Sequence, residues 1–138
     1  MAVFLDTNLF LYAAGAQHPL RSPCQAVLKQ LGRGALAGAT STEVVQELMY
    51  VLCRRGRQND ALRLARNVLA LFPNLLPVTR ADMALACNIL EQAPGIPARD
   101  AVHAATMRNN GLEVIISADR HFDAIGGIRR IDPADAVA

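Results

Sequence analysis

Short apolar runs and longer segments of helical periodicity alternate along this chain. The short runs, which are typical of buried strands, are residues 2–5, 35–39, 75–78, 114–117 and 128–131. In the longer segments, apolar positions recur every three or four residues, as in helices packed on a core. These predicted helices are residues 8–14, 22–31, 42–55, 58–71, 80–93 and 97–110. Strands that alternate with helices favour a parallel sheet covered by helices on both faces.

The ends of the predicted helices carry suitable residues. Ser41 or Thr42 can cap the helix over residues 42–55, and Gly56 can end it. Pro97 suits the first turn of the last long helix. The boundaries therefore support the alternating pattern.

Composition bounds the class of protein. The chain has 138 residues, of which 52% are hydrophobic and 19% charged, so we expect a single folded domain over residues 1–138 and no disorder. The chain has only two Tyr, four Phe and no Trp, so we do not expect an aromatic sheet surface that stacks RNA bases. The net charge of +2 neither indicates nor excludes a nucleic-acid partner, because the distribution of charge matters more than its sum.

Targeting signals are missing from the sequence pattern. Asp6 interrupts the first apolar run, and no run reaches the ~18 residues of a membrane span. The three cysteines are widely spaced and form no CxxC pair, which favours a reducing compartment. We therefore expect a cytoplasmic protein without a membrane partner.

Acidic residues occupy informative positions. Asp6 follows the first predicted strand, and Asp119 lies just beyond residues 114–117. Asp100 is in the first turn of its helix, and Glu47 is in the second turn of the helix after the second strand. In parallel sheets the ligand site lies beyond the carboxyl ends of the strands, so these four carboxylates can converge there. Each also has a structural interpretation, such as a helix cap or a solvated charge.

Convergence of carboxylates points to a metal ion. Carboxylates forced together repel one another and are costly to desolvate, and a divalent cation removes both penalties. Oxygen ligands favour Mg²⁺ or Mn²⁺, and such an ion can activate water for attack on a phosphodiester.

The motifs around these acids resemble those of PIN-domain ribonucleases, especially VapC-type toxins. The four motifs are residues 4–12 (FLDTNLFLY), 41–48 (STEVVQEL), 99–105 (RDAVHAA) and 116–122 (ISADRHF). Residues 131–133 (IDP) are also similar to the end of such toxins. The ordered set spans nearly the whole chain and is more specific than any one motif.

This resemblance implies a three-layer α/β/α PIN-like fold with a central parallel sheet, and Mg²⁺- or Mn²⁺-dependent endonuclease cleavage of RNA. It implies that the metal ligands, which are also the catalytic residues, are Asp6, Glu47, Asp100 and Asp119. It further implies that Thr7 and Asn8 orient Asp6, and that Ser117 supports Asp119. An RNA substrate, a cognate antitoxin protein and a homodimer are the implied partners.

Two further acids stay open as members of the site. Asp123 is a candidate fifth acid, although a surface position on a short helix is the simpler interpretation. Glu43 departs from the family pattern, in which a neutral residue is usual, and it lies one turn from Glu47.

Basic residues near the acids are candidates for substrate contacts. Arg99 and Arg120 adjoin the acids and could contact a phosphate of the substrate. Arg54, Arg55 and Arg57 could contact RNA or the antitoxin, or complement the helix dipole. For His103 and His121, which lie near the predicted site, structural or surface roles are the expectation, since a metal-bound water needs no histidine base.

Two other functions compete with the nuclease. An aspartate-dependent phosphatase is suggested by the strand followed by Asp, but Asn8 replaces the second acid of that motif. A catalytically silent PIN-fold binding module would keep the fold and bind only the antitoxin, but retention of all four acids argues against it. We therefore predict a metal-dependent endoribonuclease.

Overall fold

A computed structural model describes residues 2–136 of the chain. Four parallel strands form one sheet in the order β2-β1-β3-β4, with β1 (Val3–Leu5), β2 (Gly38–Ala39), β3 (Val114–Ile116) and β4 (Arg129–Ile131). The α-helices are α1 (Thr7–Ala14), α2 (Arg21–Gly32), α3 (Thr42–Arg54), α4 (Gln58–Leu71), α5 (Arg80–Gln92) and α6 (Ala98–Asn109). Two short 3₁₀ helices follow, η1 (Arg120–Ala124) and η2 (Pro133–Asp135).

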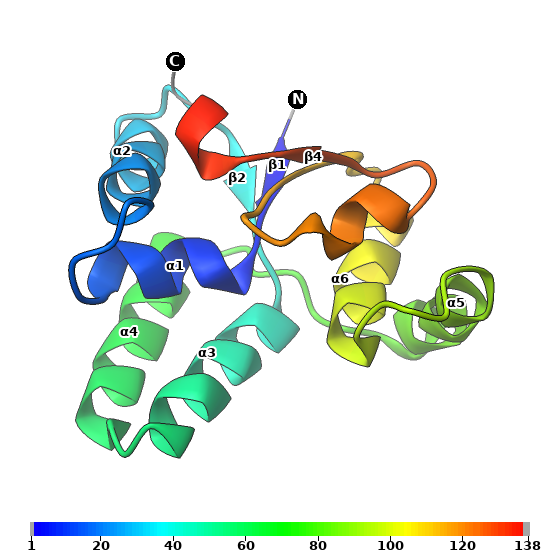
Figure 1. The fold of residues 1–138 in the computed structure, drawn as a ribbon, viewed down its shortest axis with the longest axis horizontal. Coiled ribbons are helices and arrows are strands. Elements are labelled where there is room, and N and C mark those ends of the chain that lie inside the picture. Colours follow the sequence, from blue (N-terminus) through cyan, green and yellow to red (C-terminus); the bar gives the residue numbers. More distant parts are fainter. Residues whose placement is uncertain (1, 137–138) are drawn as a thin grey trace.

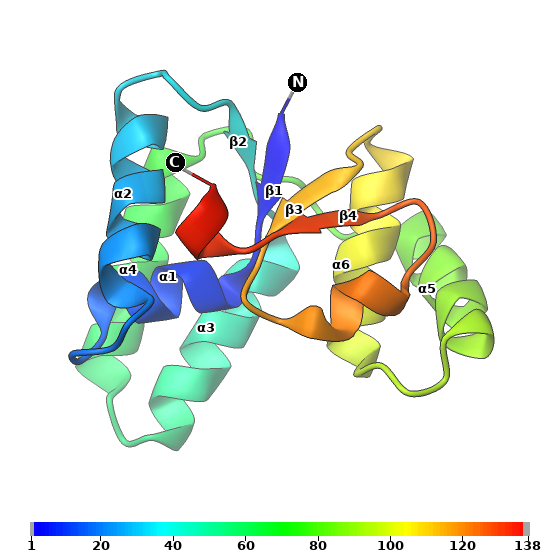
Figure 2. The same ribbon diagram turned by 45° about the horizontal axis from the view of Figure 1, so that its top comes forward.

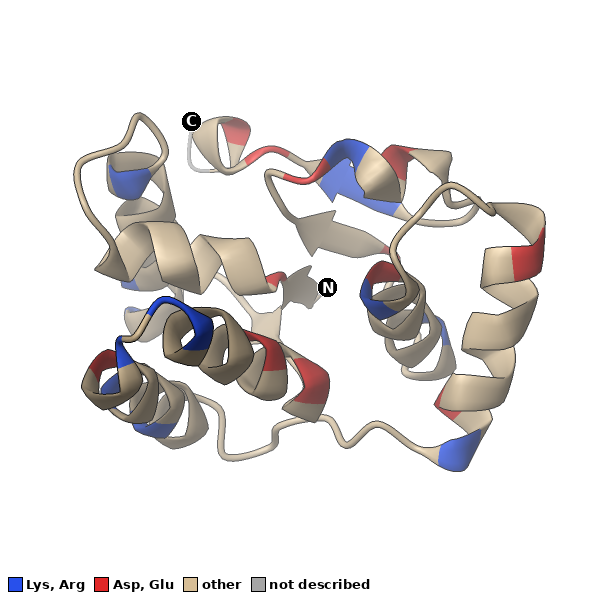
Figure 3. Cartoon of the chain, turned by 60° about the horizontal axis from the view of Figure 1, so that its bottom comes forward, with Lys and Arg blue, Asp and Glu red and all other residues tan. Residues whose placement is uncertain are grey.

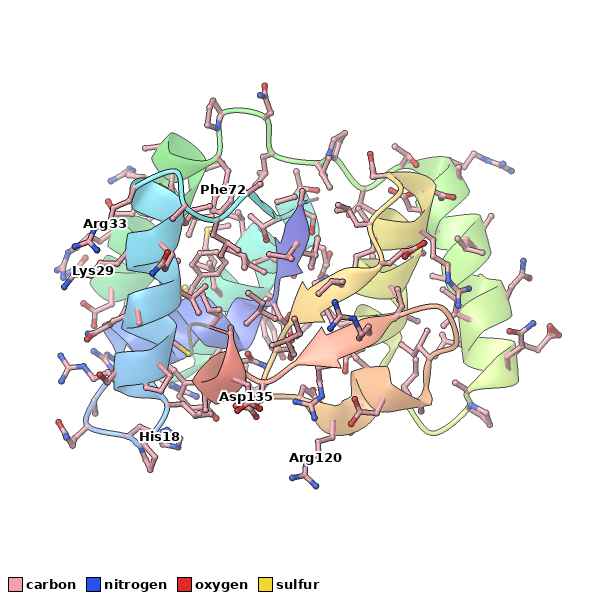
Figure 4. All side chains as sticks on the ribbon, turned by 90° about the horizontal axis from the view of Figure 1, so that it is seen from above. His18, Lys29, Arg33, Phe72, Arg120 and Asp135 are labelled. Atoms are coloured by element: carbon pink, nitrogen blue, oxygen red, sulfur yellow. The ribbon has the colours of Figure 1, made fainter. Side chains whose placement is uncertain are left out.

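Helices surround the sheet. Seen from above in Figure 4, α2 lies on one side of the sheet, and α6, backed by α5, lies on the other. The pair α3 and α4 extends from the end at which β1 runs into α1 (Figures 1 and 2). The predicted three-layer α/β/α fold is confirmed.

One predicted strand is wrong. Residues 75–78 form only an isolated bridge between Leu76 and Ser41, in which Leu76 N donates to Thr40 O at 3.0 Å. The apolar run includes Pro77, whose nitrogen carries no hydrogen for a sheet bond, so the segment cannot continue as a strand. The second predicted strand is also shorter than residues 35–39.

Local residues explain where α3 and α6 begin and end. The Ser41 side chain accepts a hydrogen bond from Val44 N at 3.3 Å and caps α3. Gly56, just beyond α3, and Gly111, just beyond α6, have φ of 73° and 71°, which a glycine adopts without strain. Pro97 is the N-cap of α6 rather than a residue of its first turn.

Apolar faces of the helices and the strands form a continuous core. On α3 the buried stripe comprises Val44, Val45, Leu48 and Leu52, as the helical periodicity predicts. In β1, Phe4 and Leu5 are fully buried. Within residues 2–136, no helix is long and apolar enough to cross a membrane.

The register of the sheet positions the polar residues beyond it. Leu5 pairs with Ile116 across β1 and β3. The next residues, Asp6 and Ser117, are therefore neighbours at the carboxyl edge, and the Ser117 hydroxyl donates to Asp6 Oδ2 at 2.6 Å. Parallel pairing thus brings together two residues that are far apart in the sequence.

Candidate active site

Four carboxylates converge at the carboxyl edge of the sheet, and we call Asp6, Glu47, Asp100 and Asp119 the acidic cluster. Figure 3 views this edge, with acidic positions of α3, α6 and the ends of β1 and β3 around one region. Two groups each have ligand atoms within 4.8 Å of one another: Asp6, Glu47 and His103, and Asp100, Asp119 and His121. The structure therefore brings together all four acids that the sequence singles out, and adds two histidines.

Asp6 is held by a set of hydrogen bonds. Its Oδ1 accepts from Thr7 N at 2.8 Å, which caps α1. Its Oδ2 accepts from Asn8 Nδ2 at 3.1 Å and from the Ser117 hydroxyl. Only 4% of Asp6 is exposed, so these bonds fix a nearly buried carboxylate in one orientation.

Ser117 has a wider role than support of Asp119. Besides donating to Asp6, its hydroxyl accepts from Asp119 N at 2.9 Å and from Asn8 Nδ2 at 3.1 Å. Asn8 also accepts from Ala118 N at 3.3 Å. Ser117 and Asn8 therefore tie the segment after β3 to the segment after β1.

Glu47 is positioned by two side chains. The Thr7 hydroxyl donates to its Oε1 at 2.6 Å, and His103 Nε2 lies 3.0 Å from the same oxygen. Thr7 therefore orients Glu47 with its side chain and Asp6 with its backbone, whereas the family resemblance implied only that Thr7 orients Asp6. Burial raises the pKa of Glu47, but the hydrogen bonds of His103 and Thr7 outweigh it and the net shift is downward.

The remaining two acids share a histidine. His121 Nδ1 lies 2.7 Å from Asp119 Oδ1 and 3.2 Å from Asp100 Oδ2. Burial, followed by the charges of Asp6 and Asp119, raises the pKa of Asp100 to about 7. Burial also raises the pKa of Asp6, in spite of the nearby His103.

These pKa shifts test whether the residues fit a divalent ion. The carboxyls of Asp6 and Asp100 resist ionisation because they are buried near other carboxylates. A divalent cation would relieve that repulsion, and carboxylate oxygens are its preferred ligands. The donor set of the acidic cluster therefore fits a divalent metal ion.

Glu43 lies beside the cluster rather than within it. Arg99 Nε lies 3.3 Å from Glu43 Oε1, and its NH1 lies 3.5 Å from Glu47 Oε2. Glu43 joins neither group of ligand atoms among the described residues. The geometry thus favours Glu47 as the glutamate of the site, and it places Arg99 directly against it.

Asp123 and Arg120 are not brought into the cluster. Asp123 forms a two-point ion pair with Arg130, at 3.0 Å from Nε and 3.2 Å from NH2, and its side chain is 53% exposed. Arg120 is exposed on η1 and points away from the ribbon in Figure 4. Of the two predicted phosphate-contact residues, only Arg99 contacts an acid of the cluster.

The two histidines contact the acidic cluster, although the sequence predicts only structural or surface roles for them. His103 is fully buried, and His121 contacts two acids although half of its side chain is exposed. A sequence signal for His103 exists, because it follows Asp100 by three residues and therefore lies on the same face of α6.

The parallel sheet with carboxylates gathered at its carboxyl edge agrees with the PIN-like fold and site that the sequence motifs imply. The family model "PIN domain" matches residues 3–128, and the chain belongs to this family. Ribonuclease VapC7 of Mycobacterium tuberculosis is 33% identical over 135 residues, which cover 95% of this chain and 91% of the relative. The predicted resemblance to VapC-type PIN domains is thereby confirmed.

Solved structures share the fold. A crystal structure of FitAcB from Neisseria gonorrhoeae aligns with a TM-score of 0.74 and 25% identity, over 96% of this chain and 98% of the other. VapBC-5 from Mycobacterium tuberculosis, described as a member of the VapBC family of toxin-antitoxin systems, aligns with a TM-score of 0.63 and 19% identity. It covers 94% of this chain and 97% of the other, so the fold is shared over nearly the full length.

Proposed function

We propose that this chain is a metal-dependent endoribonuclease and acts as the toxin of a toxin–antitoxin pair. The observation that carries the proposal is the convergence of four carboxylates, from four separate segments, into two adjacent groups of ligand atoms. The similarity to an enzyme named a ribonuclease gives the reaction class and supports RNA as the substrate.

The acidic cluster would hold the ion, with Mg²⁺ or Mn²⁺ as the proposed metals. When bound, such an ion supplies an activated water and positive charge against the phosphate. Asn8 and Ser117 hold the Asp6 carboxylate in place, while Thr7 and His103 hold that of Glu47. The chain's own contribution is therefore a set of oriented ligands that need little rearrangement.

Partner proteins belong to the same proposal. The similarity to a member of a toxin–antitoxin family supports a cognate antitoxin, encountered in the cytoplasm. We also propose that residues 1–138 act as one domain and that two copies associate. Light scattering on the purified chain, alone and with the co-expressed antitoxin, would give both stoichiometries.

The test is cleavage of a panel of structured RNAs in Mg²⁺, in Mn²⁺ and in EDTA. Wild-type protein is expected to cut with metal only, and Asp6→Asn is expected to cut at least ~100-fold more slowly. Asp123→Asn is the matched control, because it makes the same chemical change outside the cluster, and it should retain activity.

The outcomes separate the competing functions. Cutting in EDTA, or equal cutting by folded Asp6→Asn protein, would refute the metal-dependent nuclease. Absence of cutting by folded, antitoxin-free protein would favour the catalytically silent binding module. Release of phosphate from small phosphomonoesters, without RNA cleavage, would favour the aspartate-dependent phosphatase.

A further inference from the structure

An exposed aromatic side chain lies beside the acidic cluster on α3. Tyr50 follows Glu47 by three residues, so the two side chains lie on adjoining parts of one helical face. Tyr50 is 45% exposed, in a chain that has only two tyrosines and no tryptophan. A large aromatic surface is thus open to solvent one helical turn from a candidate metal ligand.

Two arginines flank the Tyr50 ring. The Arg54 guanidinium carbon lies 5.8 Å from the ring centroid, and Arg54 NH1 donates to the tyrosine hydroxyl at 3.3 Å. The Arg99 guanidinium carbon lies 5.3 Å from the centroid. Among the described residues, Arg54 has no carboxylate within ion-pair distance, so its charge is available to a ligand.

Arg99 connects this surface to the acidic cluster. It lies over Tyr50 and at the same time within 3.5 Å of Glu47 Oε2. A chain of direct contacts therefore runs from the ring of Tyr50 through one guanidinium group to an acid of the cluster. A ligand bound by Tyr50 and Arg54 would lie next to any phosphate bound at the cluster.

We propose that Tyr50, Arg54 and Arg99 form a subsite for one unpaired nucleotide adjacent to the scissile phosphate. The base stacks on the exposed part of the Tyr50 ring, and Arg54 contacts a backbone phosphate. This inference rests on the proposed function, since it assumes that the cluster cleaves RNA. An exposed aromatic ring beside the Arg54 guanidinium, both next to the acidic cluster, suits a base together with its backbone phosphate.

The subsite has a consequence for the form of the RNA. A base within a duplex is already stacked on both faces and cannot reach the Tyr50 ring. The nucleotide that binds here is therefore unpaired, as in a loop or a single-stranded segment. Only one aromatic residue takes part, so the subsite does not require an aromatic sheet surface.

The first experiment reports stacking directly. Because the chain lacks tryptophan, Tyr50→Trp creates a single tryptophan at the subsite, and Leu69→Trp creates one at an exposed position on α4. Both proteins are titrated with a short single-stranded oligouridylate and with a duplex RNA, in EDTA to prevent cleavage. Saturable quenching is expected for Tyr50→Trp with the single strand only.

The second experiment measures affinity by anisotropy of the same labelled oligonucleotide. Tyr50→Ala is expected to weaken binding by about fivefold or more, and the matched surface variant Leu69→Ala to leave it unchanged. Arg54→Gln is expected to lower the slope of log affinity against log salt by about 0.7, the value for one phosphate contact on a single strand. Arg66→Gln, which removes an exposed arginine of α4, should keep the wild-type slope.

Three results would overturn the subsite. They are equal affinities of Tyr50→Ala and Leu69→Ala, absence of saturable quenching at Tyr50→Trp, and an altered oligomeric mass of Tyr50→Ala with unchanged RNA affinity. The last result would assign the surface to a protein contact. Metal-dependent cleavage that is lost in Asp6→Asn is scored separately, so the subsite can fail while the proposed function stands.

Discussion

His103 Nε2 lies 3.0 Å from Glu47 Oε1 and 3.7 Å from Asp6 Oδ1, so one fully buried imidazole contacts two acids on different elements. Burial disfavours the charged imidazole, but the hydrogen bond to Glu47 and the charges of Asp6 and Glu47 outweigh it and raise the pKa of His103. His103 on α6 therefore links Glu47 on α3 to Asp6 at the end of β1.

Substitution of His103 is expected to weaken metal binding at the acidic cluster. His103→Gln keeps a hydrogen-bond donor, and we expect a 10- to 100-fold loss of apparent Mn²⁺ affinity, which is typical of residues that orient metal ligands. Calorimetric Mn²⁺ titration measures this loss. His18→Gln, at an exposed histidine, should bind as the wild type does, and an equal loss in both variants would refute the positioning role.

The two glutamates of α3 are expected to differ. Glu47→Gln should reduce RNA cleavage by about 100-fold or more, because it removes a charge from the acidic cluster. Glu43→Gln should retain cleavage within a few-fold, since the Glu43 carboxylate pairs with Arg99 at the margin of the site and joins neither group of ligand atoms among the described residues. Initial cleavage rates at saturating Mg²⁺ compare them, and the opposite ranking would assign Glu43 as the ligand.

Stability of the metal-free protein is expected to fall as the pH rises from about 4 to 7. In that range an unfolded aspartate has lost its proton, whereas Asp100, with its pKa raised to about 7, retains it when folded. The raised pKa of His103 acts in the same direction near neutral pH, because its bound proton also favours the folded state and is lost as the pH rises. We expect the free energy of unfolding to decrease by a few kcal/mol across this range.

Thermal melts across this pH range, with and without Mn²⁺, test the linkage. Asp100→Asn should flatten the profile, since an amide does not titrate. Mn²⁺ should raise the melting temperature more at neutral than at acidic pH, because metal binding requires the ionised carboxylates. A flat profile for the metal-free wild type would contradict the raised pKa of Asp100.

Asp82 is expected to stabilise the fold without taking part in the site. Its carboxylate accepts from Thr79 N at 2.9 Å and from Asn109 Nδ2 at 2.7 Å, so it caps α5 and ties it to α6. Burial raises its pKa, but these hydrogen bonds outweigh that and lower it. We expect Asp82→Asn to reduce the free energy of unfolding by about 1–3 kcal/mol at pH 7.

The pH dependence of this loss follows from the sign of the pKa change. The stabilisation by Asp82 is present above the ordinary pKa of 3.8 and disappears as the pH falls through its lowered folded pKa. Denaturant unfolding of the variant and the wild type should therefore converge in strong acid. Asp60→Asn, which removes the surface ion pairs of Asp60 with Arg57 and Arg63, should cost under about 1 kcal/mol.

The sequence predicts the backbone placement of the site well, because that placement depends on order and register. Asp6 and Asp119 follow strands, and the carboxyl ends of parallel strands meet at one edge. The apolar pattern of residues 75–78 predicts a strand, and this prediction is wrong: the segment forms one isolated bridge, because Pro77 lacks the backbone N–H that a sheet requires.

Side-chain contacts between distant segments could not be predicted. The Thr7 hydroxyl contacts Glu47 forty positions away, and Asp123 pairs with Arg130 instead of joining the acids. Such contacts depend on rotamers and on the angle between packed elements, which periodicity does not encode.

The sheet itself offers little for an incoming strand. Its two edges are β2, which has only two residues, and β4, which carries Arg129 and Arg130. Short edges and charged side chains both discourage a further chain from extending a sheet by backbone pairing. A protein partner, whether an antitoxin or a second copy of the chain, should therefore be sought on the helical surfaces. The same short and charged edge strands also disfavour cross-β aggregation of the isolated chain.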